Sequence, residues 1–81
     1  MILKVHLFAR ARDLAGADLV SVEVADGATV ADLAAVLSRD KPQLAALLER
    51  SALAVNSEFA DPTHRLNATD EIALLPPVSG G

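Results

Sequence analysis

The sequence predicts one α+β domain, in which an amphipathic helix packs across one face of a small mixed sheet. Three observations predict this fold class. Apolar and polar residues alternate with a period of two near both ends of the chain, as in strands that bury one face. A helical pattern follows the first two strands and, because a lone hairpin cannot bury a face, this helix most simply covers the sheet. The chain has 81 residues, which is enough for one thin core.

The first part of the chain predicts a strand, a short helical turn and a second strand. In the strand at residues 2–8 the odd-numbered positions face the core, whereas His6 and Phe8 point to the other face. A helical turn over residues 9–15 ends at the glycine that follows. Residues 19–24 alternate again, with the valines facing inward.

The main helix is expected to begin at Thr29, after a turn that contains Asp26 and Gly27. Thr29 is the predicted N-cap, and Asp32, three residues later, completes an acidic variant of the capping box. The apolar residues that follow share one helical face: Val30, Leu33, Ala34 and Leu37. A second helix is expected near Pro42, with a buried stripe formed by Leu44, Leu47 and Leu48.

Two further strands are expected at residues 53–56 and 70–75, and an Asn-Ser turn follows the first of them. In the last strand, Ile72 and Leu74 face the helix. The first and last strands are both apolar enough for the centre of a sheet. Placing them side by side gives a ubiquitin-like β-grasp fold.

Composition argues against several classes of partner. The net charge is −4, and no basic cluster exceeds Arg10 with Arg12, so phosphate neutralisation offers little affinity for nucleic acid. An acidic domain of this kind more often meets basic protein partners. No apolar run approaches the ~20 residues of a membrane span, and no signal-peptide pattern opens the chain. We expect no membrane contact and a cytoplasmic location.

The usual catalytic and metal-binding constellations are missing from the sequence. The cysteine count is zero, which leaves no thiol nucleophile, iron–sulfur cluster or thiolate zinc site. His6 and His64 have no second ligand at metal-binding spacing, so both are interpreted as ordinary surface residues and no metal is expected. Asp70 and Glu71 are adjacent on a strand and face opposite ways, so they form no acid–base pair.

The C-terminal segment has a different character. The domain is predicted to span residues 1–75, and residues 76–81 to form an extended tail: Pro76, Pro77, Val78, Ser79, Gly80 and Gly81. The prolines stop the sheet and keep the chain extended, and the glycines make its tip thin enough to enter a narrow channel of a partner. A frayed terminus is the alternative. If an ATP-using partner adenylated the Gly81 carboxylate, a sulfur donor could convert it to a thiocarboxylate, which explains how a cysteine-free chain could carry sulfur.

The sequence resembles the small, sulfur-carrier subunit of molybdopterin synthase over its whole length. The resemblance rests on these segments: Phe8-Ala9 with Arg12 and Gly16, Asp26-Gly27-Ala28-Thr29-Val30, Ala54-Val55-Asn56, and the run from Asp70 through Pro76-Pro77-Val78-Ser79-Gly80-Gly81. The ending is the most specific of them. Leu74 and Leu75 stand where members of that family often have aromatic residues.

This resemblance implies a sulfur carrier in molybdenum cofactor biosynthesis. It implies that Gly81 is adenylated, becomes a thiocarboxylate and donates sulfur to cyclic pyranopterin monophosphate in the active site of a large subunit, within a heterotetramer. The carrier itself would bind no cofactor, ATP would be used by the adenylating enzyme, and the catalytic residues would belong to the large subunit.

Three alternatives share parts of the pattern. A thiamine-pathway sulfur carrier has a similar helix entry and Gly-Gly end, a ubiquitin-like modifier would join Gly81 to lysines of other proteins, and a plain interaction module would have an inert tail. Strand parity adds a predicted partner surface. Phe8 and Leu75 point away from the helix near the root of the tail, and Phe59 lies in a polar stretch without an obvious core role.

Overall fold

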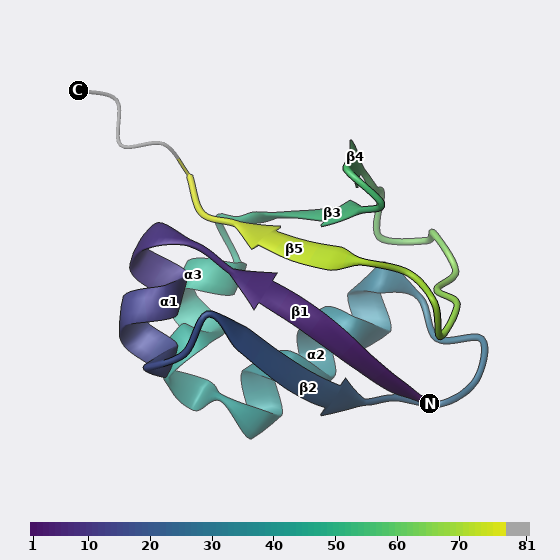
Figure 1. The fold of residues 1–81 in the computed structure, drawn as a ribbon, viewed down its shortest axis with the longest axis horizontal. Coiled ribbons are helices and arrows are strands. Elements are labelled where there is room, and N and C mark those ends of the chain that lie inside the picture. Colours follow the sequence, from purple (N-terminus) through teal and green to yellow (C-terminus); the bar gives the residue numbers. More distant parts are fainter. Residues whose placement is uncertain (78–81) are drawn as a thin grey trace.

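A computed structural model describes residues 1–77 of the chain (Figure 1). Its elements in chain order are β1 (Ile2–Leu7), α1 (Ala9–Ala15), β2 (Leu19–Glu23), α2 (Val30–Asp40), the 3-10 helix η1 (Pro42–Leu44), α3 (Ala45–Leu48), β3 (Ala52–Val55), β4 (Glu58–Phe59) and β5 (Ile72–Leu75). The five strands form one sheet in the order β2-β1-β5-β3-β4. The central pair, β1 and β5, is parallel and the other pairs are antiparallel, so the predicted mixed sheet with adjacent first and last strands is confirmed.

The helix α2 begins where its capping residues predict. The Thr29 hydroxyl accepts a hydrogen bond from the Asp32 amide at 3.2 Å, and the Asp32 carboxylate accepts one from the Thr29 amide at 3.0 Å. This reciprocal pair satisfies two amides that the first helical turn leaves without partners. The helix then buries one face, formed by Val30, Leu33 and Leu37, against the sheet.

One face of the sheet and the helices enclose an aliphatic core. Figure 1 shows α2 and α3 behind the sheet and α1 at the end where β1 and β5 finish. Within residues 1–77 every buried side chain is apolar. The largest fully buried ones are Leu3, Leu7, Leu33, Leu37, Leu44, Ile72 and Leu74. The predicted inward parity of the first and last strands is therefore correct.

Several boundaries differ from the sequence expectation. β1 ends at Leu7, because Phe8 is the residue that precedes the first turn of α1. The second helix is a 3-10 turn followed by one α-helical turn, and Leu48 is half-buried, unlike Leu44 and Leu47. β5 begins at Ile72 instead of residue 70, since Asp70 and Glu71 lie in the loop that leads into the strand.

The short strand β4 was not expected from the sequence. Asn56 and Ser57 have positive φ values of 52° and 70°, the combination found in the tight two-residue turns of hairpins. This turn reverses the chain and pairs Glu58 and Phe59 with β3.

None of the helices in the described residues combines the length and the apolar composition that crossing a bilayer requires.

Candidate functional site: the open face of the sheet and the root of the tail

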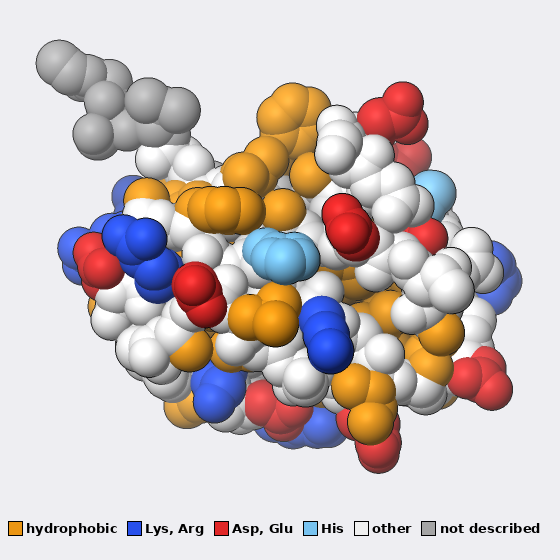
Figure 2. Space-filling model, in the orientation of Figure 1, with side chains coloured by type: hydrophobic (Ala, Val, Ile, Leu, Met, Phe, Trp, Pro, Cys, Tyr) orange, Lys and Arg blue, Asp and Glu red, His pale blue; other side chains and the backbone are white. Residues whose placement is uncertain are grey.

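The face of the sheet opposite the helices forms a continuous row of side chains. Directly opposite residues of neighbouring strands point to the same face, so the strand registers define this row. From one edge of the sheet to the other it consists of Leu19, His6, Ala73, Ala54 and Phe59. Hydrophobic side chains gather over β1, β5 and β3 on this face (Figure 2). We call it the open face.

Two of the predicted partner residues lie together at the root of the tail. β1 and β5 are parallel with Leu7 opposite Leu74, so Phe8 and Leu75 follow side by side at the same end of the sheet. The Phe8 side chain is 48% exposed and Leu75 is half-buried. Leu75 directly precedes Pro76, which is half-buried, and Pro77, which is exposed. Phe8 lies beside Leu75 at this point.

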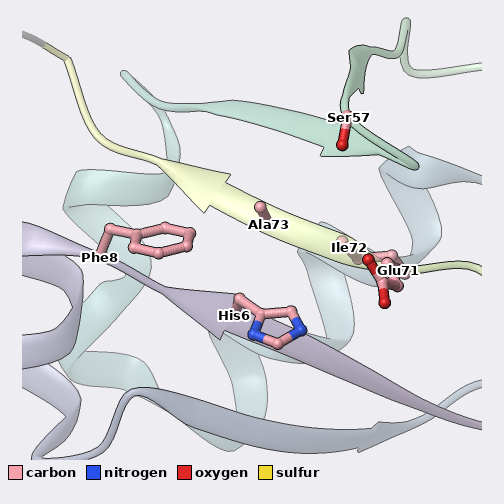
Figure 3. A pocket seen from close by; sticks show the side chains of 6 residues that line it. All are labelled: His6, Phe8, Ser57, Glu71, Ile72 and Ala73. Carbon is pink, nitrogen blue, oxygen red and sulfur yellow. The ribbon is translucent and has the colours of Figure 1, made fainter.

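The backbone at Ala9 holds Phe8 in place. Ala9 has φ of 50°, in the left-handed region that costs a residue with a Cβ about 1–2 kcal/mol. This turn lets the chain leave β1 for α1 immediately after Phe8, while the Phe8 backbone stays extended. The Phe8 ring then lies over the sheet toward Ala73 (Figure 3). Local strain of this kind often occurs at functional surfaces.

The open face contains a hollow beside this ring. It is lined by His6, Phe8, Ser57, Glu71, Ile72 and Ala73 (Figure 3). Its floor is apolar, and Ser57 and Glu71 form its polar rim on the side of the β3–β4 turn. The hollow can therefore accept an apolar side chain.

The Asn56 side chain fixes the polar rim of the hollow. Its amide nitrogen donates to the Asp70 carboxylate at 3.0 Å, and its carbonyl oxygen accepts from the Glu71 amide at 2.9 Å. The backbone N–H of Asn56 also donates a hydrogen bond to the backbone carbonyl of Glu71, at 2.7 Å. These bonds tie the β3–β4 turn to the start of β5, so Ser57 and Glu71 keep a fixed separation.

Phe59 lies apart from the other two predicted partner residues. It belongs to the edge strand β4, opposite Ala54, and its side chain is 78% exposed. Three strand spacings, or about 14 Å, separate β1 from β4. Phe59 also borders a second hollow between α2 and β3. The three residues therefore share the outer surface without forming one cluster, and a partner that contacts all of them must cover most of the open face.

The predicted tail residues Val78, Ser79, Gly80 and Gly81 lie outside the described residues. Among residues 1–77 no group of three acidic, histidine or cysteine side chains is arranged to hold a metal ion. His64 lies in the loop after Pro62, remote in sequence and structure from His6 on β1. In that loop, hydrogen bonds from the Thr63 hydroxyl and amide lower the pKa of the exposed Asp61 carboxyl below its usual 3.8. We assign this carboxyl a role in loop structure.

The fold and this surface define a ubiquitin-like β-grasp protein with an exposed apolar face beside its C-terminal segment. The chain belongs to the ThiS family, whose model matches residues 5–81. It is 40% identical to the molybdopterin synthase sulfur carrier subunit of Dictyostelium discoideum, covering 96% of this chain and 94% of that one. The subunit of the same name from Escherichia coli is 38% identical, with 98% and 99% covered.

Two solved structures extend this comparison. SAMP1 of Haloferax volcanii superposes with a TM-score of 0.88 at 32% identity, over 100% of both chains. A complex of subunits 1 and 2 of the molybdopterin-converting factor from Helicobacter pylori contains a chain that superposes with a TM-score of 0.72 at 28% identity, again over 100% of both chains. The resemblance to molybdopterin synthase sulfur carriers and the β-grasp fold are thereby confirmed.

The sequence predicted the tail and the aromatic residues but not the row of side chains that crosses the open face. His6 was interpreted as an ordinary surface residue, and its side chain is exposed on β1. The missing information was the register of β1 with β5 and β2. Only that register shows that the nearest residues across the sheet from His6 are Ala73 and Leu19, both apolar.

Proposed function

We propose that this chain is the sulfur carrier subunit of a molybdopterin synthase and that its Gly81 carboxylate is the group that carries sulfur. The observation that carries the proposal is the full-length similarity to relatives named as that subunit. The cysteine-free composition supports it, because sulfur must then be held by an atom other than a thiol.

The chemistry proceeds through an activated carboxyl group. The Gly81 carboxylate attacks the α-phosphorus of ATP on an adenylating enzyme, which forms an acyl adenylate and releases pyrophosphate. A donor that delivers sulfur at the oxidation state of sulfide then displaces AMP and leaves a thiocarboxylate. This anionic sulfur attacks a carbon of cyclic pyranopterin monophosphate and replaces an oxygen, which leaves with the phosphate or as water. Hydrolysis of the resulting acyl–sulfur bond then leaves the sulfur on the pterin and returns the carboxylate. Glycine leaves the acyl carbon open at each step.

The open face is the surface we assign to the large subunit. The complex of the two Helicobacter pylori subunits supports a partner of this type for a chain of this fold. Phe8 and Leu75 adjoin the root of the tail, so docking there would direct the following segment into the partner. An apolar surface of this kind, next to the reactive segment, is typical of an interface anchor.

Mass spectrometry tests the sulfur-carrying step. The intact protein, incubated with its adenylating enzyme, ATP and a sulfur source, should gain the mass that corresponds to one oxygen replaced by sulfur, and the change should map to Gly81. A chain lacking Gly81 is the control and should remain unchanged. Absence of the mass shift in the intact protein, under conditions in which ATP is consumed, would refute the carrier role.

Removal of Gly81 should also abolish sulfur transfer while the melting temperature stays nearly constant, because a terminal residue ordinarily contributes little to folding. Gly80→Val should reduce transfer, since a β-branched side chain widens the tip. The measurement is molybdopterin formation in the reconstituted synthase. Normal transfer by the truncated chain would contradict the assignment of Gly81.

A second candidate function follows from the similarity to SAMP1, a member of the small archaeal modifier proteins. The same activated Gly81 could form an isopeptide bond with a lysine of another protein. Trypsin cleaves after Arg65, so digestion of tagged protein from cells and a search for lysines that carry residues 66–81 distinguish this activity from sulfur transfer.

A further inference from the structure

The junction of β1 and α1 places a strained residue next to an exposed aromatic ring. We propose that Ala9 is a positioning residue: its left-handed backbone, confined by the alanine Cβ, fixes Phe8 in the direction in which Phe8 docks, and this lowers the stability of the free protein. The inference rests on the proposed function, because it assumes that Phe8 contacts the large subunit.

The strain at Ala9 is not offset by packing or by a polar side chain. Ala9 has φ of 50° although it has a Cβ and no polar group that could bond to the nearby backbone. Its side chain is exposed, so the methyl group gains no burial in return. The other two non-glycine residues with positive φ within residues 1–77, Asn56 and Ser57, are polar residues of the turn that joins β3 to β4. Turn chemistry explains those two residues, but it does not explain an alanine.

A glycine at position 9 would remove this strain but would also loosen the junction. Glycine populates positive φ about as readily as negative φ, whereas a residue with a Cβ is confined to a small left-handed region. The alanine Cβ therefore keeps the angle between β1 and α1 within a narrow range. A residue that is strained but stiff is expected where the direction of a neighbouring group matters more than stability.

Packing and hydrogen bonds hold Phe8 only weakly. Its side chain is 48% exposed, and the ring lies over the sheet toward the small side chain of Ala73 (Figure 3). The Phe8 carbonyl accepts hydrogen bonds from the amides of Ala11 and Arg12 at 3.1 and 3.4 Å, and the second of these is long. Both donors belong to α1, which has seven residues, of which only Ala11 is buried, and a helix this short is marginal on its own. The backbone at Ala9 therefore determines the direction of Phe8.

A ring that is fixed before docking should bind more tightly than a mobile ring. Less conformational freedom is lost at the interface when the free protein already holds the bound direction. Phe8 also adjoins Leu75 at the root of the tail, so the same stiffness fixes where the partner lies relative to the tail. Ala9 therefore lowers stability and raises affinity, and substitutions at this position can separate the two effects.

Calorimetric titration against the large subunit, together with amide NMR relaxation of the free full-length chain, tests the inference. Ala9→Gly should raise the Kd for the large subunit about fivefold. Its melting temperature should stay within about 3 °C of the wild type, because the relief of strain is opposed by the greater freedom of the unfolded chain. The order parameters of the amides of residues 8 and 9 should fall from about 0.85 toward about 0.6. Ala9→Asn should keep the Kd within about twofold of the wild type, since asparagine tolerates the left-handed region and retains a Cβ.

The glycine at the other end of α1 provides the matched control. Gly16 also has a left-handed backbone, with φ of 73°, and a Cβ added there would meet no atom within 4 Å. Gly16→Ala should lower the melting temperature by about 5 °C through strain alone and leave the Kd unchanged.

The inference is overturned if Ala9→Gly binds as tightly as the wild type or keeps its order parameters. It is also overturned if Ala9→Asn loses as much affinity as Ala9→Gly, or if Gly16→Ala weakens binding equally. Absence of wild-type binding would instead overturn the proposed partner, and the order parameters of the free chain would then decide whether Ala9 positions Phe8.

Discussion

The two faces of the sheet are built from the same strands but have different compositions. On the helix side, alternate residues of β1 and β5 are fully buried aliphatic side chains such as Leu3, Val5 and Ile72. On the open side, the intervening residues include His6, Phe8 and Ala73, which line a hollow. We call the helix-covered side the closed face, and its composition can be explained by packing alone. The open face leaves aromatic and titratable groups in water, and folding gives no reason for their placement, so a binding role is the simpler explanation.

The strongest test of this contrast is a core truncation. Leu37→Ala, at a position with no exposed surface, should lower the free energy of unfolding by about 3 kcal/mol, because it removes apolar contacts and leaves a cavity. Leu19→Ala on the open face, where the side chain is 40% exposed, should lower it far less. Chemical denaturation measures both changes. Equal losses in the two variants would break the distinction between the faces.

The second test changes binding without changing stability. Phe8→Glu or Leu75→Glu should weaken binding to the large subunit by about 2 kcal/mol or more, because a charged group replaces an apolar anchor. The melting temperature should change little for Phe8→Glu, whose side chain is already half in solvent. Ile2→Glu is the control, since Ile2 is 60% exposed at the opposite end of β1. If the control weakens binding as much, the site has been placed at the wrong end of the sheet.

A smaller effect is expected at the entry to α2. Thr29→Ala should cost about 1 kcal/mol of stability through loss of the N-cap, and Thr29→Ser should restore most of it. Affinity for the large subunit should be unchanged at a temperature where both variants are folded, because the cap belongs to the helix side. A selective loss of binding in Thr29→Ala would show that the helix side also contacts the partner.

The smallest effect concerns acid pH. Thr63 holds Asp61 in its ionised form, so the pKa of this carboxyl is lower in the folded state than in the unfolded state. Its stabilising contribution is full above the unfolded value and is lost as the pH falls through the folded value. Denaturation midpoints measured between about pH 6 and pH 2 should therefore decline slightly less in Asp61→Asn than in the wild type. A steeper decline in the variant would contradict this interpretation of the hydrogen bonds.

The sequence predicted the closed face better than the open one, for a physical reason. Burial against a helix imposes a strict period of two on β1 and β5 and a helical period on α2, so both patterns are visible in one sequence. The strand β4 has only two residues, one charged and one aromatic, and its pairing depends on the positive φ values of the preceding turn. Leu66, which is buried in the core, stands alone in a polar loop and shows no period at all.

The candidate site, too, could be predicted from the sequence only in part. Strand parity identified Phe8 and Leu75, and residue types identified the glycine ending. The separation of Phe59 from the other two residues and the position of His6 between Leu19 and Ala73 depend on the order and register of five strands. These are long-range relations, which composition and local periodicity do not contain.

The central position of β5 has a consequence for how the chain matures. β5 bridges β1 and β3, so a chain that stops before Ile72 has only two unconnected hairpins, β2 with β1 and β3 with β4. Pairings between such distant segments form late in folding, since the closure of long loops must precede them. The strand that completes the sheet is also the strand from which the glycine ending extends. Gly80 and Gly81 are therefore synthesised on the ribosome only after every strand of the sheet.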